Sequence, residues 1–408
     1  MGAELFFIGV TRFSLFYPHA AGWNLTGRFS SPEEYATMLF SSARLDPRVE
    51  IFLNLTVPQL QMASSKYNFR HVVQISPQLP EDTKARLREA EAEYPFLIVS
   101  EQPTARGHSE DLDDHIRAFA SEVDSPDGLF ARFRLDDDDV LATDYFQQLE
   151  PYVNSANVGM NVSFGSGYQA AFYAGTIFDL RSLYHPRNSM GMAQICRVRA
   201  SGRIEWRSYS NHARSDLEVP TILDSRFPTV LSLKHNGQDT FAGEDEGRKF
   251  EKATRLLGLE SPADYRSLEK RFPVVKDRCV KAWGSEARLD NGPFPIELQT
   301  DAQAARFEIL GPGIFEIDLA YESGDVANDR RIFAALPIRP KVLQFPWSDF
   351  HGGSIVAGAA FGEHGLARFP IYLGRGESCS SATIWQSRAA TPGNLLKSVT
   401  VRGRSIDE

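Results

Sequence analysis

Four consecutive aspartates stand in the stretch RFRLDDDDVLATDYF, which runs from Arg132 to Phe146. Neighbouring carboxylates repel one another, and each costs free energy when it leaves water without a partner. Such a run indicates either a solvated segment or a site that receives a cation. Side chains two residues apart in an extended chain point to the same side, so Asp136 and Asp138 can face one point. An oxygen-only environment of this kind suits Mg²⁺ or Mn²⁺.

A divalent metal at this position would have a definite chemistry. A metal ion that bridges a diphosphate neutralises the charge that develops on a nucleoside-diphosphate leaving group during transfer of a sugar. Two other interpretations are structural. An aspartate before a helix is a good N-cap, so Asp138 or Asp139 could serve only the helix. The segment does not match an EF-hand calcium loop. With Asp136 as position one, Leu141 stands where the loop needs glycine, and Gln147 stands where it needs glutamate.

The first half of the chain alternates strand-like and helix-like patterns around this run. The stretch ELFFIGV is apolar throughout, as in a strand buried on both faces. Ser31, followed by Pro32 and two glutamates, predicts the start of a helix. Further strands are predicted over 69–77, 95–101 and 128–135, further helices over 80–94 and 110–123, and a helical face after the aspartates over 142–153. This alternation predicts a doubly wound α/β sheet, in which ligands bind beyond the carboxyl ends of the strands.

The second half of the chain has a different character. From about Val158 the pattern becomes strand-rich, and a helix is predicted near 244–259. Near the C-terminus, GIFEIDLAY alternates apolar and mostly polar residues, which is typical of a half-buried antiparallel strand. Several short strands follow it without intervening helices and predict a β-sandwich. We therefore predict an α/β nucleotide-sugar-binding domain over 1–285 and an all-β sandwich-like domain over 286–408.

Composition limits the functional classes. The chain has 408 residues and a formal net charge of −9, whereas a nucleic-acid-binding protein would carry a basic footprint. Its three cysteines are far apart and form no CxxC pair, so a reducing compartment, the cytoplasm, is expected. We find no signal peptide, and no window of about 18 apolar residues predicts a transmembrane helix.

Four stretches carry a resemblance to a known family: GVTRFS, RVEIFLNLTVPQLQMASSKYNFRHVVQISPQLP, ARFRLDDDDVLATDYF and LKHNGQDTF. They make residues 1 to about 260 similar to the putative rhamnosyltransferase family, a branch of the GT-A-type glycosyltransferases. The chain departs from the family pattern at Gln59, where serine is usual, and at HVVQISP, which lacks a terminal aspartate. The resemblance implies a GT-A fold, a nucleotide-sugar donor, a saccharide acceptor and a divalent metal ion.

The resemblance also implies roles for individual residues. Asp136 and Asp138 would form the Asp-x-Asp pair that binds the metal, and Asp137 and Asp139 would orient the pair or contact substrate. Arg12, at the carboxyl end of the first strand, could bind the donor diphosphate in a bidentate manner.

Further site residues come from the later part of the resembling region. His235 could complete the coordination of the metal or contact a phosphate, with Asn236 beside it. His212 is assigned to substrate binding on similar grounds. Transfer with inversion needs a general base, for which we name Asp216. Other carboxylates that could serve as the base are Glu218, Asp224 and Asp239.

The leading hypothesis is a cytoplasmic, metal-dependent glycosyltransferase. It would move rhamnose or another hexose from a nucleoside diphosphate to a saccharide acceptor of a surface polysaccharide. The C-terminal β domain would hold the acceptor, place the enzyme at a membrane surface or support oligomerisation. One alternative is a non-catalytic carbohydrate-binding protein with a structural calcium ion, and another is a phosphohydrolase that uses the same acidic cluster.

Overall fold

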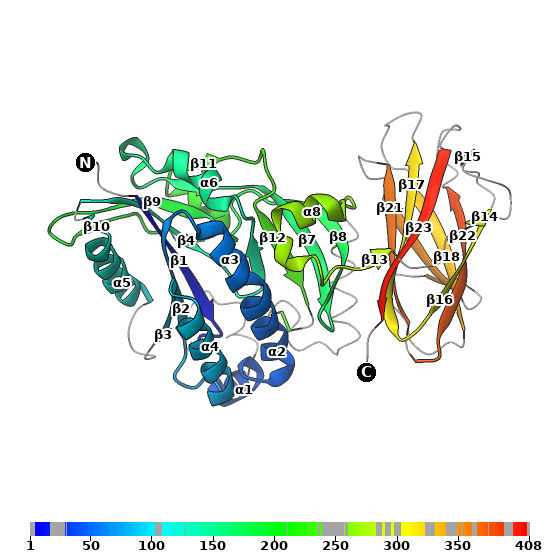
Figure 1. The fold of residues 1–408 in the computed structure, drawn as a ribbon, viewed down its shortest axis with the longest axis horizontal. Coiled ribbons are helices and arrows are strands. Elements are labelled where there is room, and N and C mark those ends of the chain that lie inside the picture. Colours follow the sequence, from blue (N-terminus) through cyan, green and yellow to red (C-terminus); the bar gives the residue numbers. More distant parts are fainter. Residues whose placement is uncertain are drawn as a thin grey trace.

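A computed structural model describes most of the α/β part and the strands of the β part (Figure 1). The described residues are 5–16, 29, 31–102, 108–125, 127–209, 211–235, 237–238, 257, 260–282, 288–289, 295–297, 303–322, 331–339, 349–351, 354–360, 365–373, 375–386 and 395–405. Within these ranges, no helix has the length and apolar character that crossing a membrane requires. The predicted helix over 244–259 lies outside the described residues, apart from Leu257.

The main sheet is mixed and is ordered β11-β6-β9-β4-β1-β2-β3, with β10 paired to β9. Its central strands β1, β2, β3 and β4 are parallel, and β9 runs antiparallel to β4. The strands are β1 (Phe6–Phe13), β2 (Asn68–Ile75), β3 (Leu97–Glu101), β4 (Leu129–Arg134), β6 (Asn161–Ser163), β9 (Ala193–Val198), β10 (Ile204–Glu205) and β11 (Thr221–Leu223). All four predicted strands of this region are present, so the α/β prediction is confirmed.

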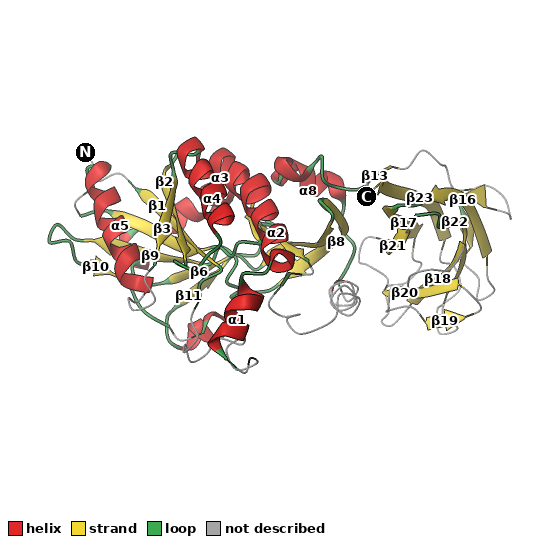
Figure 2. Ribbon diagram, turned by 90° about the horizontal axis from the view of Figure 1, so that it is seen from below, coloured by secondary structure: helices red, strands yellow, loops and turns green. Residues whose placement is uncertain are grey.

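Helices cover both faces of the main sheet (Figure 2). Phe7 and Phe13 of β1 face a core formed with α2 (Ser42–Ile51), α3 (Val57–Ser64) and α4 (Glu81–Glu93). Phe6 and Ile8 face the opposite side, where α5 (His108–Glu122) packs. Near these helices lies α1 (Pro32–Leu39), whose N-cap Ser31 accepts a hydrogen bond from the amide of Glu34, as its sequence predicts.

The helix α2 passes into α3 through a π-helix, η2 (Phe52–Thr56). A π turn contains one residue more than an α turn, and such turns are frequent at functional sites. Because the backbone stays helical on both sides of η2, residues 42–64 form one continuous rod against the sheet.

A second, smaller sheet is ordered β5-β12-β7-β8. It consists of β5 (Asp139–Leu141), β12 (Val230–Lys234), β7 (Ser166–Tyr173) and β8 (Thr176–Tyr184). The helix predicted over 142–153 is present as α6 (Tyr145–Leu149) and η3 (Glu150–Tyr152), but it does not follow the aspartates directly, because Asp139–Leu141 pair with β12 first. The remaining helical elements are η4 (Ser155–Asn157), η5 (His212–Leu217), α8 (Tyr265–Arg271) and η7 (Pro273–Val275).

The C-terminal part contains two antiparallel sheets that share one hydrophobic core. One sheet is ordered β13-β23-β17-β21 with β15 on β23, and the other β14-β16-β22-β18-β20-β19. The strands are β13 (Lys281–Ala282), β14 (Arg288–Leu289), β15 (Ile296–Glu297), β16 (Gln303–Leu310), β17 (Gly313–Glu322), β18 (Arg331–Arg339), β19 (Asp349–His351), β20 (Ser354–Ala360), β21 (Leu366–Leu373), β22 (Ser378–Gln386) and β23 (Leu395–Ser405). The division at residue 285 stays a prediction, although β13 already pairs with β23 four residues earlier in the chain.

A buried ionic cluster joins the two parts. Arg368 of β21 forms a bidentate pair with Asp318 of β17, at 2.8 and 3.0 Å, and its Nε lies 3.3 Å from Glu316. The same guanidinium donates to the carbonyl of Leu180 in β8 at 2.7 Å. Glu316 accepts hydrogen bonds from the amide of Asp179 and the hydroxyl of Tyr265. Charged side chains of the β part are thus paired inside the contact with the α/β part.

His71 of β2 ties β1 to the start of the aspartate run. The hydroxyl of Thr11 donates to the carbonyl of Leu135 at 2.8 Å and accepts from His71 Nε2 at 2.8 Å. A Cβ at Gly9 would lie 2.2 Å from His71 Nδ1, so only glycine leaves room for the imidazole. The residue that precedes Asp136 is therefore fixed to the first strand.

The buried imidazole makes stability depend on pH. Burial lowers the pKa of His71 from 6.5 to about 3. As the pH falls, His71 takes up a proton near pH 6.5 in the unfolded chain but only near pH 3 in the folded chain. The free energy of unfolding therefore decreases as the pH falls from about 6.5 to about 3. Between pH 7 and 5 we expect the wild type to lose about 2 kcal/mol more than His71→Gln in urea unfolding. Equal losses would show that His71 does not titrate in this way.

Candidate active site

The aspartate run leaves the carboxyl end of β4 and enters β5, and most of it is buried. The exposed fractions of Asp137, Asp138 and Asp139 are 3%, 8% and 3%. The N-cap of the following helix is Asp144, whose side chain makes no capping hydrogen bond. The alternative of solvated helix caps is therefore wrong for these three aspartates, and their burial requires specific partners.

An arginine from α2 supplies one partner. Arg48 Nη1 contacts Asp137 Oδ1 directly and lies 3.9 Å from Asp138 Oδ2. One helical turn earlier, Arg44 donates to Ser14 Oγ at 2.8 Å. The two buried guanidiniums stand four residues apart on one helix face. Sequence reasoning missed both, although their spacing within a helical segment was a usable signal.

Residues of the segment after β12 supply further hydrogen-bond donors to Asp138. His235 Nε2 and Gln238 Nε2 each lie 3.2 Å from Asp138 Oδ2. The amide of Gly237 donates to His235 Nδ1 at 3.1 Å, which leaves the imidazole proton on Nε2, facing Asp138. The structure thus brings Asp138 and His235 together as predicted, while the predicted Asn236 lies outside the described residues.

The carboxylates of the run differ in their tendency to ionise. Burial alone would raise the pKa of Asp138, but Arg48 and the hydrogen bond from His235 outweigh it and hold the pKa well below its usual range. Burial raises the pKa of Asp137. Burial and the charges of Asp138 and Asp136 raise the pKa of Asp139 well above its ordinary value. Among the three buried aspartates, the negative charge is therefore favoured on Asp138.

Asp139 contacts residues of the π-helix and of β12. Its carbonyl accepts a hydrogen bond from Thr56 Oγ1 of the π-helix at 2.9 Å, and its side chain interacts with Ser232 of β12. These contacts fix the backbone directly after Asp138. The arrangement favours a positioning role for Asp139 over the substrate contact that the resemblance implied.

Asp136 takes different partners from Asp138. Its Oδ1 lies 2.7 Å from Nη2 and 2.9 Å from Nε of Arg134, and its Oδ2 lies 3.4 Å from Ser189 Oγ. Among the described side chains, no group of three His, Cys, Asp or Glu residues is arranged to hold a metal ion.

Two of the predicted ligands nevertheless suit a divalent metal. Neighbouring ligands of an octahedral ion at about 2.1 Å stand about 3 Å apart. Asp138 Oδ2 and His235 Nε2 lie 3.2 Å apart, and Asp138 is the carboxylate that favours ionisation. For Nε2 to bind a metal, the imidazole proton must move to Nδ1 and the contact with Gly237 must open.

Arg12 and His212 are half-buried and lie near the Arg134–Asp136 pair. Arg12 is near the end of β1, opposite Gln74 of β2. His212 begins η5, and its pKa is lowered by burial and then by Arg134, while Asp136 acts in the opposite direction. The structure thus places His212 beside the Arg134–Asp136 pair.

Asp216 lies four residues further along η5. Its Oδ2 lies 2.5 Å from Arg187 Nη1, and its side chain is about one-third exposed. Among the described residues, Asp216 forms no hydrogen bond or ion pair with Asp138 or His235.

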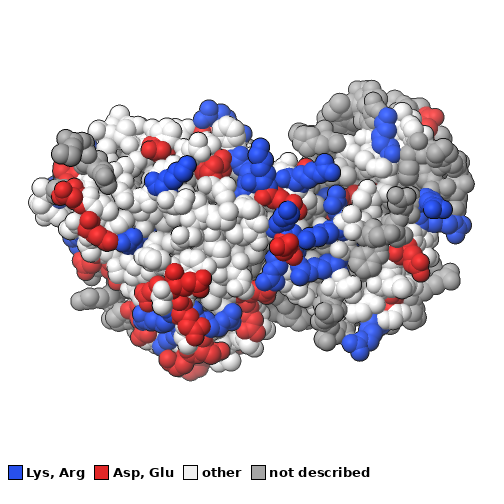
Figure 3. Space-filling view, viewed as in Figure 1, with Lys and Arg blue, Asp and Glu red and all other residues white. Residues whose placement is uncertain are grey.

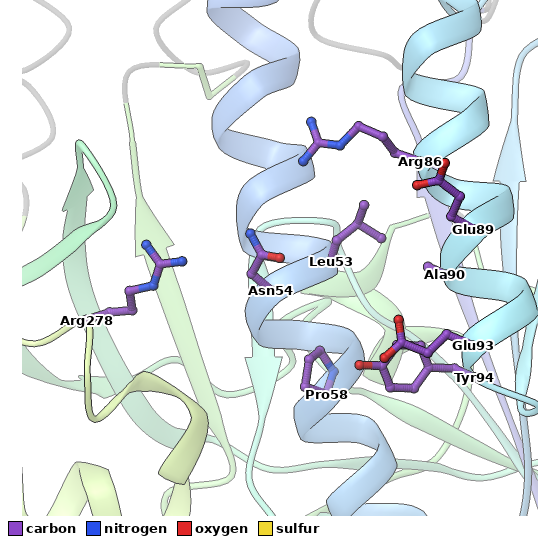
Figure 4. A pocket seen from close by; sticks show the side chains of 9 residues that line it. All are labelled: Leu53, Asn54, Pro58, Arg86, Glu89, Ala90, Glu93, Tyr94 and Arg278. Atoms are coloured by element: carbon purple, nitrogen blue, oxygen red, sulfur yellow. The ribbon is translucent and has the colours of Figure 1, made fainter.

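A separate pocket of about 510 Å³ lies between the rod of residues 42–64 and α4 (Figure 4). Arg86 and Glu89 project from α4, and Asn54 projects from the π-helix toward them. The pocket is lined by Leu53, Asn54, Pro58, Arg86, Glu89, Ala90, Glu93, Tyr94 and Arg278. It contains none of the predicted site residues, so it is distinct from the aspartate site.

Comparison with solved structures gives weak likenesses. A 4-diphosphocytidyl-2C-methyl-D-erythritol synthase is 11% identical with a TM-score of 0.28, covering 63% of this chain and 99% of its own. TarS 1-349 of S. aureus is 9% identical with a TM-score of 0.23, covering 65% and 68%. A family 35 carbohydrate binding module of Clostridium thermocellum is 14% identical with a TM-score of 0.17, covering 30% and 95%. No protein of curated function matches the chain.

Comparison with protein families gives a definite assignment. The family described as putative rhamnosyl transferase matches residues 7–244, which is more than half of the chain and includes the aspartate run and His235. The interpretation as a carbohydrate-binding protein without catalysis is therefore wrong. The chain belongs to the putative rhamnosyl transferase family and is a glycosyltransferase.

Proposed function

We propose that the protein transfers rhamnose or another hexose from a nucleoside diphosphate to a saccharide acceptor, with help from a divalent metal ion. The observation that carries this proposal is Asp138, a buried carboxylate that favours ionisation, placed where the parallel strands β1 and β4 end. Ligands of open α/β sheets bind beyond such strand ends. This position, together with the family, supports a GT-A-type arrangement of donor and metal.

Asp138 would bind the metal directly, with His235 beside it and Asp136 at the exposed edge. The bound metal would neutralise charge on the departing nucleoside diphosphate. Arg48 fixes the carboxylates of Asp137 and Asp138, so their orientation needs little rearrangement when the donor binds. Arg12, near the same strand ends, would pair with the donor diphosphate.

Transfer requires that a base removes the proton of the acceptor hydroxyl as the glycosidic bond to the diphosphate breaks. We propose Asp216 for this step, oriented by Arg187. His212, whose lowered pKa favours the neutral imidazole, would contact substrate near Asp136.

We expect Asp216→Asn to lower kcat by about a hundredfold or more, since general base catalysis contributes about 10²–10⁴. KM for the donor should change little, because the amide removes basicity without removing volume. The matched control is Asp114→Asn on α5, an exposed carboxylate that also pairs with an arginine, Arg117, at 2.8 Å. A kcat within threefold of the wild type would assign the base to another residue.

The proposed donor class can be tested by calorimetric titration of the full chain with UDP, dTDP and GDP, each with and without Mn²⁺. We expect one nucleotide to bind tightly only when Mn²⁺ is present. At a hundredfold excess over its dissociation constant, it should raise the apparent free energy of unfolding by about 2.7 kcal/mol. Tight binding without metal would overturn the metal requirement, and no binding of any nucleotide would overturn the donor assignment.

A further inference from the structure

A basic surface lies where the α/β part meets the β part, and Figure 3 shows its blue side chains gathered at this junction. Its main segment is 264–281, which contains α8 and the connection to β13. This segment carries three Asp or Glu side chains and six Lys or Arg side chains, which are Arg266, Lys270, Arg271, Lys276, Arg278 and Lys281. The excess of positive charge is notable in a chain whose formal net charge is −9.

The surface continues onto the β part. Arg404 of β23 donates to the carbonyl of Asp277 at 2.7 Å, and Lys281 pairs in register with Gly403. The guanidinium of Arg402 lies 5.5 Å from the ring centroid of Tyr265 in α8. Because these contacts cross the junction, the cations belong to one continuous face. We call this face the junction patch.

Three cations of the junction patch have no carboxylate partner among the described residues. Arg266, Lys270 and Lys276 are exposed, and none of them forms an ion pair with a described Asp or Glu. By contrast, Arg271 lies 2.5 Å from Asp144, and the remaining two pair with Glu50 and Asp277. The three unneutralised charges are the part of the patch that an external anion can use.

An exposed aromatic ring stands at the edge of the junction patch. Phe227 is 40% exposed, and the guanidinium carbons of Arg226 and Arg271 lie 5.6 and 5.5 Å from its ring centroid. Exposed aromatic rings flanked by cations are typical of surfaces that lie in the headgroup layer of a bilayer, where the ring enters the acyl boundary and the cations meet phosphates.

We propose that the junction patch docks the enzyme on the surface of an anionic phospholipid bilayer. Clusters of four to eight basic residues are the usual size for binding anionic lipid headgroups. Charge alone would also suit a soluble polyanion, but Phe227 favours a bilayer, because only a bilayer offers an apolar layer beneath its anionic groups. This inference does not depend on the donor or on the metal.

The test is co-sedimentation of the full chain with vesicles of phosphatidylcholine alone or of phosphatidylcholine with phosphatidylglycerol. We expect binding only to the anionic vesicles, and weaker binding as salt is added. Each basic residue near such a surface contributes about fivefold, so Arg266→Glu/Lys270→Glu/Lys276→Glu should weaken binding about a hundredfold or more. The matched control, Lys66→Glu/Arg86→Glu/Arg203→Glu, changes three exposed cations outside the patch and should bind much more strongly than the patch variant.

Phe227→Ala distinguishes the bilayer from a soluble polyanion such as dextran sulfate. We expect this variant to bind anionic vesicles several-fold more weakly than the wild type, with unchanged binding of dextran sulfate. Equal weakening by the patch variant and its control would show that net charge, not the junction patch, drives binding. Binding of dextran sulfate without binding of anionic vesicles would overturn the bilayer in favour of a soluble polyanion.

Discussion

Asp138→Asn should lower glycosyl transfer by at least a hundredfold and leave the fold intact. The amide has the shape of the carboxylate and can still accept a hydrogen bond from His235, while Arg48 keeps Asp137 as its partner. What disappears is the charge of the one buried aspartate of the run whose pKa stays low. A metal ion that neutralises a leaving group contributes several kcal/mol, and each 1.4 kcal/mol changes a rate about tenfold. Transfer assays with and without Mn²⁺ measure the effect.

The control is Asp144→Asn, which changes an aspartate of the same segment that pairs with Arg271 and does not face the run. It should retain most of the activity. Thermal unfolding of both variants shows whether a loss of activity comes from a loss of folded protein. If Asp138→Asn kept activity within threefold of the wild type, Asp138 would have no role in transfer and the metal site would have to be sought elsewhere.

Arg368→Met should lower the free energy of unfolding by about 3–5 kcal/mol, the usual cost of removing one partner from a buried ion pair. Glu316 would lose its counter-charge inside the contact between the two parts, and Asp318 would keep only the partly exposed Arg402, at 3.2 Å. Burial already raises the pKa of Glu316 to about 7, against the opposing effect of Arg368. Without Arg368, Glu316 would be left without a cation in a medium that disfavours its charge.

Urea unfolding of Arg368→Met checks this value. Arg375→Met, an exposed arginine of the same β part, should change stability by no more than about 0.5 kcal/mol. Adding Glu316→Gln and Asp318→Asn to Arg368→Met should restore much of the loss, because the uncompensated charges are then gone. A loss below about 1 kcal/mol for Arg368→Met alone would mean that water reaches the cluster.

The sequence predicted the main elements because their signals are local. The apolar run at β1, the Ser31 cap and the helical face of α5 each follow from residues close in the chain. The aspartate run was recognised for a similar reason, since four adjacent carboxylates are unusual whatever surrounds them.

What the sequence could not supply was the set of partners that make the run chemically distinct. Arg48 lies 89 residues before Asp137, and Gln238 lies 100 residues after Asp138. Alternation predicted the strand that carries Asp318, but its pairing with Arg368 depends on the register between β17 and β21. Such contacts are set by tertiary packing, which a single sequence does not encode locally. For the same reason β5 was not predicted, because three residues form a strand only where β12 is present to pair with them.

The π-helix between α2 and α3 has a consequence for how the chain tolerates changes in length. Successive residues of an α-helix are about 100° apart around its axis. Deleting one residue from Phe52–Thr56 would convert the π turn into an α turn and leave α3 facing nearly as it does now, because the π turn holds the one additional residue. Leu60 and Ala63 would stay in the core, and Arg48 would still face the aspartates. A deletion within Phe52–Thr56 should therefore be less damaging than a deletion in α4, which would rotate the rest of that helix by about 100°.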